Sequence, residues 1–575
     1  MISDELKKIQ ENKVDQSESE LLRDKFEHHW REFSTFRTHC SEVASLCYNE
    51  ADDFYETYNA SSKGEKKNLK IYDDTAAQSL TTFSAVMESL NVPSSERWHR
   101  TQPARVDLRR NKKIQKYYDS LTEALFIHRY NPRANFQGQM AIGYSSLGAF
   151  GNKIIFTDKR AEGGVRYKAC FMGDMCWDVN HQGLPNQSFR RFDYSNQQIF
   201  EAVTTGVWKG GNLPSEVMGE LTAIKPEWNK RHEYIHVVLP NNQLEHGKKD
   251  FRGMAFASFY IHRNTGEVVH RSGYRTNPYA ISRYAQSPHE NMGRGPLMRV
   301  FNEVRTLNEM AKDQLSISHL AVHPALLIHD DGIVSSGGSQ FDLRPGGQNF
   351  GAVSREGRPL VHPLNSGTQP ILNEQLMEIK RNTIEKAMLV DVFNRVSDKD
   401  ARMTAQEALL RDREKSGLVG PIMGREQTEG LTPMIEREID ILEAQGFLPE
   451  KPQELIDALR EHPSAGDFDV VHESPIMQLQ KSGAQIAVDK VTNKALELAQ
   501  YDEGEAVGML DSEFILLHTI ESSGAPYGML KSEDQIQQEN EAKAQQQQAS
   551  QLQEMAPAMS DTVLNLAKAQ EITGG

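Results

Sequence analysis

Apolar residues that recur every three or four positions predict helices in the first quarter of the chain. From 18 to 60 this spacing matches one face of an α-helix. The same period predicts helices over about 73–90 and about 110–129. The chain is therefore expected to begin with a helical region.

After about residue 150 the pattern changes to short runs of β-branched and aromatic residues, which are typical of strands. Four residues at 263–266 have the composition of a hairpin turn. The elements predicted here are strands within 152–177 and at 232–239, 255–262 and 267–274, with one helix at 195–207. Helices and strands are therefore mixed in this region.

Two prolines mark the starts of long helices in the second half of the chain, because proline suits the first helical position. Pro296 is expected to begin a helix that runs to about Val322. Pro370 is expected to begin another that runs to about Val392. The residues between them, 325–369, are rich in Gly, Pro, Ser and Asp, which favours loops with short strands.

The segment Met403–Leu442 predicts a long amphipathic helix with interruptions. Thr404 and Glu407 have the spacing of a capping box, in which the two side chains bond each other's backbone N–H groups. Glycines and prolines should kink or interrupt the rod at Gly417, Gly420-Pro421, Gly430 and Pro433. A charged helix of this kind suggests a subunit that lies against copies of itself.

The rest of the chain is predicted to be helical and then of low complexity. After Phe447 the pattern predicts helix again to about Met509. The residues 535–553 are rich in Gln, which suggests a solvated or intermittently helical extension.

Composition favours an elongated or multi-lobed protein over one compact globule. The 575 residues carry a net charge of −15 and a mean hydropathy of −0.60. The acidic balance argues against a DNA binder as a whole, because such proteins usually carry a basic surface. No apolar run reaches about 18 residues, so no membrane span is expected. The polar N-terminus shows no signal peptide.

Few motifs in the chain carry chemistry. No GxxxxGK[ST] or GxSxG motif is present. Gly293-Arg294-Gly295 is expected to be a hinge before a helix, and Asp330-Asp331-Gly332 a turn. The cysteines lack CxxC spacing and are expected to be buried, reduced thiols at Cys40, Cys47, Cys170 and Cys176.

One literal match is His232-Glu233-Tyr234-Ile235-His236, the HExxH pattern of zinc proteases. In those enzymes the two histidines lie one helical turn apart and share a zinc ion, and the glutamate is the general base. The β-branched and aromatic residues here, followed by Pro240, favour a strand instead. On a strand His232 and His236 would lie about 13 Å apart, too far to be ligands of one zinc.

The loop 394–402 alternates basic and acidic residues. One interpretation is a solvated surface loop. The other is a loop that faces nucleic acid, in which Arg395, Lys399 and Arg402 make transient phosphate contacts.

Short stretches spread over about residues 20–530 resemble one family when their order and spacing are taken together. They are Ser95–Trp98, Leu147–Gly151, Arg271–Tyr274, Pro278, Gly293–Pro296, Thr306–Asn308 and Thr404–Leu442. Two helices that flank a Gly/Pro-rich insert, followed by a polar loop and a long kinked helix, complete the pattern. The chain thus resembles the portal proteins, or head-to-tail connectors, of short-tailed double-stranded DNA bacteriophages.

The resemblance implies an α+β, multidomain and mainly helical fold that assembles as a ring of twelve around a DNA channel at one capsid vertex. It divides the chain into named regions. They are the wing (1–290), stem helices (296–323 and 370–392), clip (324–369), channel loop (393–403), long kinked wing helix (404–447), helical crown (448–530) and Gln-rich tail (531–575).

The resemblance also implies a non-enzymatic protein of the virion, with no catalytic residue, metal or cofactor. Its expected partners are double-stranded DNA, the terminase large subunit, a tail adaptor protein, and capsid and scaffolding proteins. It would assemble in the bacterial host cytoplasm. The implied DNA-contacting residues are Arg395, Lys399 and Arg402, and the implied clip residues that dock terminase and tail adaptor are Arg344, Arg355 and Arg358.

Charge is consistent with this interpretation. A ring of twelve chains would carry about −180 formal charges, and a channel wall that grips DNA would stall it, because each phosphate contact adds affinity. Two alternatives remain at this point: a zinc metalloprotease through His232–His236, and an internal scaffold-type virion protein.

Overall fold

The computed structural model describes helices and strands in most of the chain between residues 18 and 497. The described residues are 18–48, 54, 70–208, 213–241, 244, 248, 251–322, 326–328, 353, 356–359, 361–363, 370–390, 419–462, 468–473, 488–497, 510–511, 515–516 and 519. They belong to two compact units. The first combines Met1–Ser94 with Arg129–Gln445, and the second combines Ser95–His128 with Gly446–Gly575.

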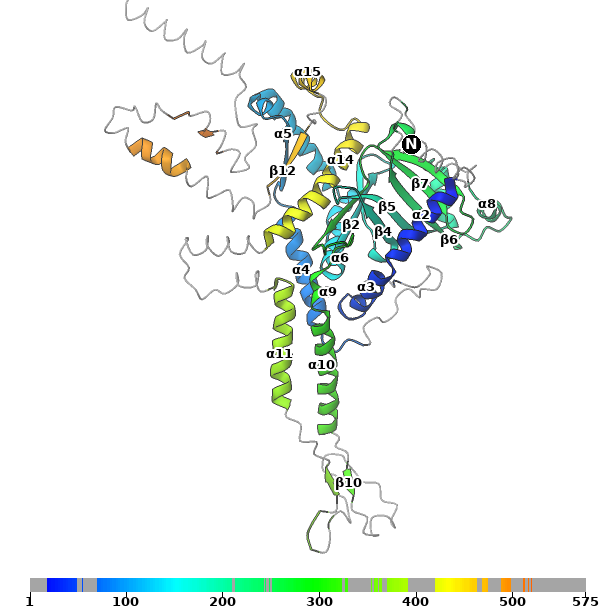
Figure 1. The fold of residues 1–575 in the computed structure, drawn as a ribbon, viewed down its shortest axis with the longest axis vertical. Helices are drawn as coiled ribbons and strands as arrows, with labels where there is room; N and C mark the ends of the chain where they lie inside the picture. Colours follow the sequence, from blue (N-terminus) through cyan, green and yellow to red (C-terminus); the bar gives the residue numbers. More distant parts are fainter. Residues whose placement is uncertain are drawn as a thin grey trace, which may run out of the picture. The chain divides into compact units, whose positions relative to one another are not determined.

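Two antiparallel sheets form the centre of the first unit (Figure 1). The five-stranded sheet has the order β4-β5-β6-β7-β8, and the three-stranded sheet has the order β3-β2-β9. Their strands are β2 (Asn152–Lys159), β3 (Val165–Ala169), β4 (Met175–Val179), β5 (Pro185–Ser195), β6 (Arg231–Pro240), β7 (Phe256–His262), β8 (Val268–Tyr274) and β9 (Tyr279–Arg283). The strands expected within 152–177 and at 232–239, 255–262 and 267–274 are confirmed.

Helices pack against both sheets. The first, α2, buries Leu22 and Phe26 toward the five-stranded sheet, and the Phe26 and Phe189 ring centroids are 6.5 Å apart. The described helices of this unit are α2 (Glu18–Glu32), α3 (Ser34–Cys47), α4 (Thr75–Asn91), α6 (Phe136–Phe150), α7 (Asn196–Thr204), α8 (Ser215–Leu221), α9 (Pro296–Arg299), α10 (Phe301–Val322), α11 (Pro370–Ala387) and α14 (Thr432–Ala444).

The helix α6 lies in the core and was not predicted. It packs against α4 and against strands β2 and β3, so apolar residues surround it and the amphipathic signal is lost. Its glycines also lower helix propensity. Gly148 has a packing reason, because a Cβ there would lie 2.7 Å from Leu80 Cδ1 on α4.

The two proline-initiated helices form an antiparallel pair, α10 and α11, which lie side by side (Figure 1). The short strands β10 (Leu326–Ile328) and β11 (Val361–Pro363) pair between them in the chain. The predicted starts at Pro296 and Pro370 are confirmed, although the helix from Pro296 is broken at Val300 into α9 and α10.

The second unit combines α5 (Lys112–Arg129), all but its last residue, with β1 (His99–Pro103), α15 (Gln453–Glu461) and β12 (Phe468–His472). Leu455 of α15 packs with Ile114, Tyr118 and Leu121 of α5. The expectation of continuous helix from 447 to 509 is wrong at β12, which pairs antiparallel with β1. The partner strand lies more than 300 positions earlier, so no local pattern revealed it.

Among the described residues, no helix is both long and apolar enough to cross a membrane. The expected burial of the cysteines is confirmed. All four cysteines are buried and unpaired, and burial raises the pKa of each thiol.

Candidate functional site

The HExxH motif lies on strand β6, as the sequence predicted. His232 Nε2 lies 2.9 Å from Glu220 Oε2. His236 is fully enclosed, with Tyr279 Oη 2.6 Å from Nδ1 and Ser258 Oγ 2.9 Å from Nε2. The two histidines therefore serve different hydrogen bonds and do not converge on one metal ion.

Electrostatics around this strand also fits a structural role. Burial lowers the pKa of His236 well below its ordinary value. Although burial opposes the shift, hydrogen bonds from Lys230, Asn196 and His232 lower the pKa of Glu220 to about 2. Near neutral pH the His236 imidazole is therefore neutral and the Glu220 carboxylate is charged, and hydrogen bonds hold both groups in place.

Most residues that the resemblance assigned to partners lie outside the described part of the chain. These are Arg395, Lys399 and Arg402 of the channel loop and Arg344 and Arg355 of the clip, together with the capping box at Thr404 and Glu407. Arg358 is described and its side chain is exposed next to the turn at 356–357.

The α10–α11 pair is held at one end by residues 70–73, which precede α4. Asn308 of α10 is buried, donates to the Lys70 carbonyl at 3.0 Å and accepts from the Tyr72 N–H at 2.7 Å. Arg381 of α11 donates to Asp73 Oδ2 through Nε and Nη2, at 3.1 and 2.9 Å. One short segment thus fixes both helices of the pair.

The segment before α9 packs tightly against the end of α6. A Cβ on Gly295 would lie 2.7 Å from the Gly151 nitrogen, and one on Gly293 would lie 2.3 Å from the Gly151 oxygen. Asn152 accepts from the Gly293 N–H at 2.7 Å and donates to its carbonyl at 3.1 Å. The structure shows a close-packed junction here, where the sequence suggested a hinge.

The long helix is helical without interruption from Val419 to Ala444, but its turns are not uniform. The residues Glu426–Leu431 form a π-helix directly before α14. The Thr432 N–H bonds to the Gln427 carbonyl, five residues back, and Pro433 follows in the first turn of α14. A wider turn accommodates the ring and the missing N–H of Pro433.

The described chain is helical through Gly420 and Pro421, so the interruption predicted at this pair is not found. The irregularity predicted near Gly430 and Pro433 is present as the π-helix at Glu426–Leu431.

Buried ion pairs hold the π segment to the three-stranded sheet. Glu426 pairs with Lys153 of β2, and both side chains are 1% exposed. Glu426 also accepts from Ser282 Oγ at 2.6 Å. Glu429 accepts from Arg283 Nη2 at 2.7 Å and Nε at 3.0 Å. Burial lowers the pKa of Lys153, while Glu426 opposes that shift.

A third buried pair holds α14. Arg129 and Glu438 are 0% and 1% exposed, with Arg129 Nη2 2.5 Å and Nε 3.1 Å from Glu438 Oε2. Tyr167 of β3 donates to Glu438 Oε1 at 2.7 Å, and burial followed by the Glu438 charge raises the Tyr167 pKa. These charges are compensated and enclosed, so the arrangement locks the helix to the sheet.

Sequence reasoning missed these glutamates, although a signal existed. The signal is clear for Glu438, which follows buried Ile435 by three residues and buried Leu431 by seven and so shares their helix face. Carboxylates on an apolar face require buried cationic partners. The partners come from β2, β9 and the last residue of α5, which are remote in sequence.

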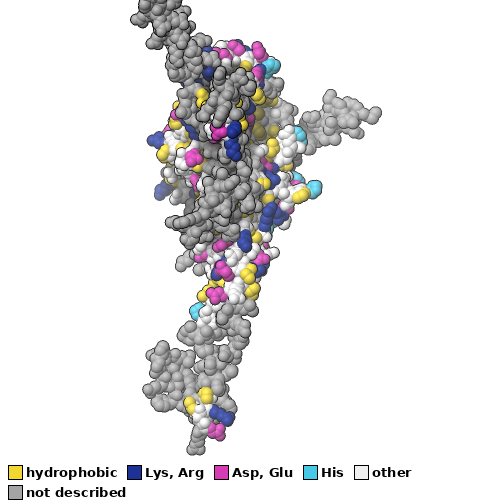
Figure 2. All heavy atoms as spheres, turned by 90° about the vertical axis from the view of Figure 1, so that its left-hand side faces the viewer, with side chains coloured by type: hydrophobic (Ala, Val, Ile, Leu, Met, Phe, Trp, Pro, Cys, Tyr) yellow, Lys and Arg dark blue, Asp and Glu magenta, His cyan; other side chains and the backbone are white. Residues whose placement is uncertain are grey.

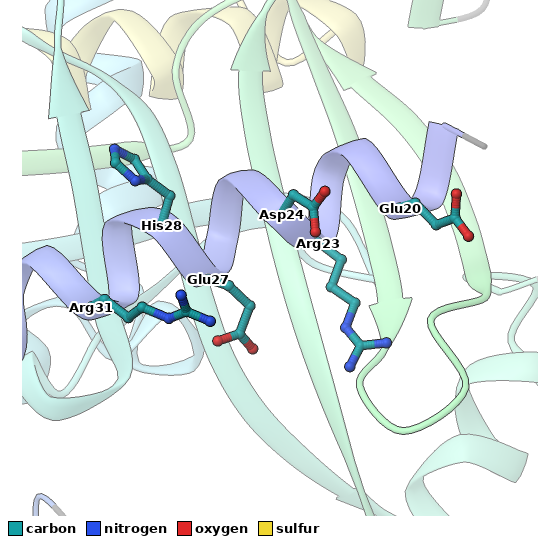
Figure 3. A pocket seen from close by; sticks show the side chains of 6 residues that line it. All are labelled: Glu20, Arg23, Asp24, Glu27, His28 and Arg31. Carbon is teal, nitrogen blue, oxygen red and sulfur yellow. The ribbon is translucent and has the colours of Figure 1, made fainter. Parts of the chain in front are cut away.

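The exposed face of α2 carries a dense set of charges (Figure 3). Acidic and basic side chains line a shallow surface hollow, which is formed by Glu20, Arg23, Asp24, Glu27, His28 and Arg31. The His28 ring points away from Glu27 and Arg31. Charges of both signs are likewise interspersed on the face drawn in Figure 2.

Comparison with known proteins identifies relatives over nearly the full length. Residues 19–530 match the family model described as bacteriophage head to tail connecting protein. The portal protein of Salmonella phage epsilon15 is 22% identical over 562 residues, which cover 95% of this chain and 93% of that protein. The probable portal protein of Bordetella phage BPP-1 is 23% identical over 487 residues, which cover 83% and 82%.

Proposed function

The chain belongs to the bacteriophage head-to-tail connecting proteins and has the role of a phage portal protein, and from this premise we propose that twelve copies form a closed ring at one capsid vertex. The family match over residues 19–530 carries the proposal. Double-stranded DNA would pass through the centre of the ring during packaging and ejection. The metalloprotease and scaffold alternatives are not favoured.

Exposed apolar side chains on the α10–α11 pair support assembly into a ring. Leu315 of α10 is 48% exposed, and Leu376 and Ile379 of α11 are 44% and 60% exposed. Neighbouring exposed apolar side chains mark interaction surfaces, and Leu376 and Ile379 are neighbours one turn apart on α11. A head-to-tail contact of this pair with the next copy would bury them, and rotation closes such contacts into rings.

The named regions are assigned on the same basis. The α10–α11 pair would be the stem, residues 324–369 the clip, 393–403 the channel loop, 404–447 the wing helix, and 448–530 the crown. The wing would be 1–290 and the Gln-rich tail 531–575. The buried ion pairs of Glu426, Glu429 and Glu438 would hold the wing helix rigidly to the wing.

In this arrangement the ring would work without catalysis of its own. The terminase large subunit would supply ATP hydrolysis and would dock, as would the tail adaptor, on the clip near Arg344, Arg355 and Arg358. Capsid and scaffolding proteins would surround the wing in the virion, after assembly in the host cytoplasm.

The channel loop offers the direct test of DNA conduction. Replacement of Arg395, Lys399 and Arg402 by Ala should lower packaging or genome retention and leave ring assembly intact. The matched control replaces three exposed basic residues of the described surface, Lys116, Arg166 and Lys225. Wild-type packaging and retention in the loop variant would refute the role of the loop.

The clip is tested separately. Deletion of residues 335–358 should preserve the fold and abolish binding of both terminase and tail adaptor, measured by pull-down with purified partners. Unchanged binding of both would refute the assignment.

A further inference from the structure

Two histidines and one glutamate converge on the last turn of α2. His28 and Glu32 are one turn apart, and His29 and Glu32 are three residues apart, so all three share one side of the helix. His28 Nε2 lies 3.5 Å from Glu32 Oε1, and His29 Nδ1 lies 3.3 Å from Glu32 Oε2. The three donor atoms all lie within 4.8 Å of one another.

These atoms have the chemistry and spacing of a metal site. Two imidazoles and a carboxylate form a donor set found in three-ligand zinc sites, which keep a fourth position open. Ligands about 2.1 Å from a tetrahedral zinc ion are separated by about 3.4 Å. Each histidine nitrogen lies near this distance from one carboxylate oxygen of Glu32, His28 from Oε1 and His29 from Oε2. His28 is 68% exposed and can rotate to close the remaining separation.

The surroundings hold one ligand in place and leave room for another. His29 is only 15% exposed, and its ring centroid lies 5.2 Å from that of buried Phe189. This contact fixes the imidazole with Nδ1 toward Glu32. His29 and Glu32 also line a groove of about 540 Å³ that extends to Trp177 and Asn291, so water can reach the site.

Figure 3 shows the His28 ring turned away from the Arg31 guanidinium. We propose that His28, His29 and Glu32 bind a divalent transition-metal ion, with zinc the best match, and water as the fourth ligand.

Equilibrium dialysis of the full-length protein tests this proposal. Protein stripped with EDTA is dialysed against Zn²⁺, and bound metal is measured by mass spectrometry. Co²⁺ serves as a second probe, because its visible absorption reports tetrahedral coordination. We expect one ion per chain at this site and a rise in the thermal midpoint on binding.

Variants assign the ion to these residues. His28→Gln and Glu32→Gln replace side chains that are 68% and 61% exposed, so both should fold, as circular dichroism would verify. Each should weaken zinc binding at least tenfold, whereas His319→Gln, an exposed histidine on α10, should leave binding unchanged. Zinc binding that persists at wild-type strength in the double variant His28→Gln/Glu32→Gln would overturn the proposal. Loss of binding only in His236→Gln would also overturn it.

Discussion

Glu438→Gln should destabilise the first unit strongly, because it removes the counter-charge of a fully buried guanidinium. Arg129 and Glu438 are 0% and 1% exposed, and Tyr167 also donates to this carboxylate at 2.7 Å. Glutamine keeps the shape but carries no charge and turns an N–H group toward one of these donors. Removing one partner of a buried pair costs about 3–5 kcal/mol.

Urea unfolding monitored by tryptophan fluorescence measures this cost. A loss of about 4 kcal/mol lowers the unfolding midpoint by on the order of 1 M. The matched control is Glu436→Gln, two residues earlier on α14, where the side chain reaches solvent although partial burial raises its pKa. Because the charge is not favoured at this position, its removal should cost less than about 0.5 kcal/mol. Both variants are compared at one protein concentration, because assembly adds stability.

A combined variant separates charge from shape. Arg129→Met with Glu438→Leu removes both charges, and Tyr167→Phe removes the hydroxyl that would lose its acceptor. This variant should recover most of the lost stability, because apolar groups often replace buried ion pairs without cost. If Glu438→Gln unfolds at the same urea concentration as Glu436→Gln, the Arg129–Glu438 pair does not stabilise the fold.

Three further predictions follow from single contacts. Burial lowers the pKa of His236, so below about pH 6.5 the unfolded chain binds a proton at this histidine that the folded chain does not bind. The free energy of unfolding, measured by urea titration at each pH, should therefore fall from pH 7 to pH 5, and it should fall less steeply in His236→Gln. Asp73→Asn removes the charge that Arg381 contacts through two nitrogens. It should lower the free energy of unfolding by only about 1 kcal/mol, because Arg381 is 34% exposed. Hydrogen exchange of α11 around Arg381 should become faster, and unchanged exchange would contradict the prediction. Gly151→Ala should cost about 3 kcal/mol or more by thermal unfolding, because φ is +77° and the Cβ would lie 2.3 Å from the Gly295 nitrogen; a wild-type midpoint would contradict this.

Elements with a clear local signal could be predicted from the sequence. The prolines at 296 and 370 stand at helix starts, and β-branched residues around His236 showed that HExxH is a strand. The hydrophobic pattern did not predict elements that are buried on all sides or that depend on a partner far away in the sequence. Apolar residues surround α6 in the core, and β12 is a strand only because β1 lies beside it.

The buried glutamates could not be predicted from the sequence for a similar reason. The glutamates at 426, 429 and 438 could be read as solvated charges on a helix, because their partners Lys153, Arg283 and Arg129 are distant in sequence. The π segment combines a local cause, Pro433, with these long-range pairs. The convergence of His28 and His29 on Glu32 had a local signal, His-His-x-x-Glu on a helix, but only side-chain geometry shows that the three groups meet.

Electron microscopy of the purified protein decides whether the chain assembles as proposed. Closed rings with twelve-fold symmetry and a central opening are expected, at a mass of about 780 kDa for twelve chains of 65.0 kDa. Monomers, open filaments or particles without a central opening under assembly conditions would contradict it.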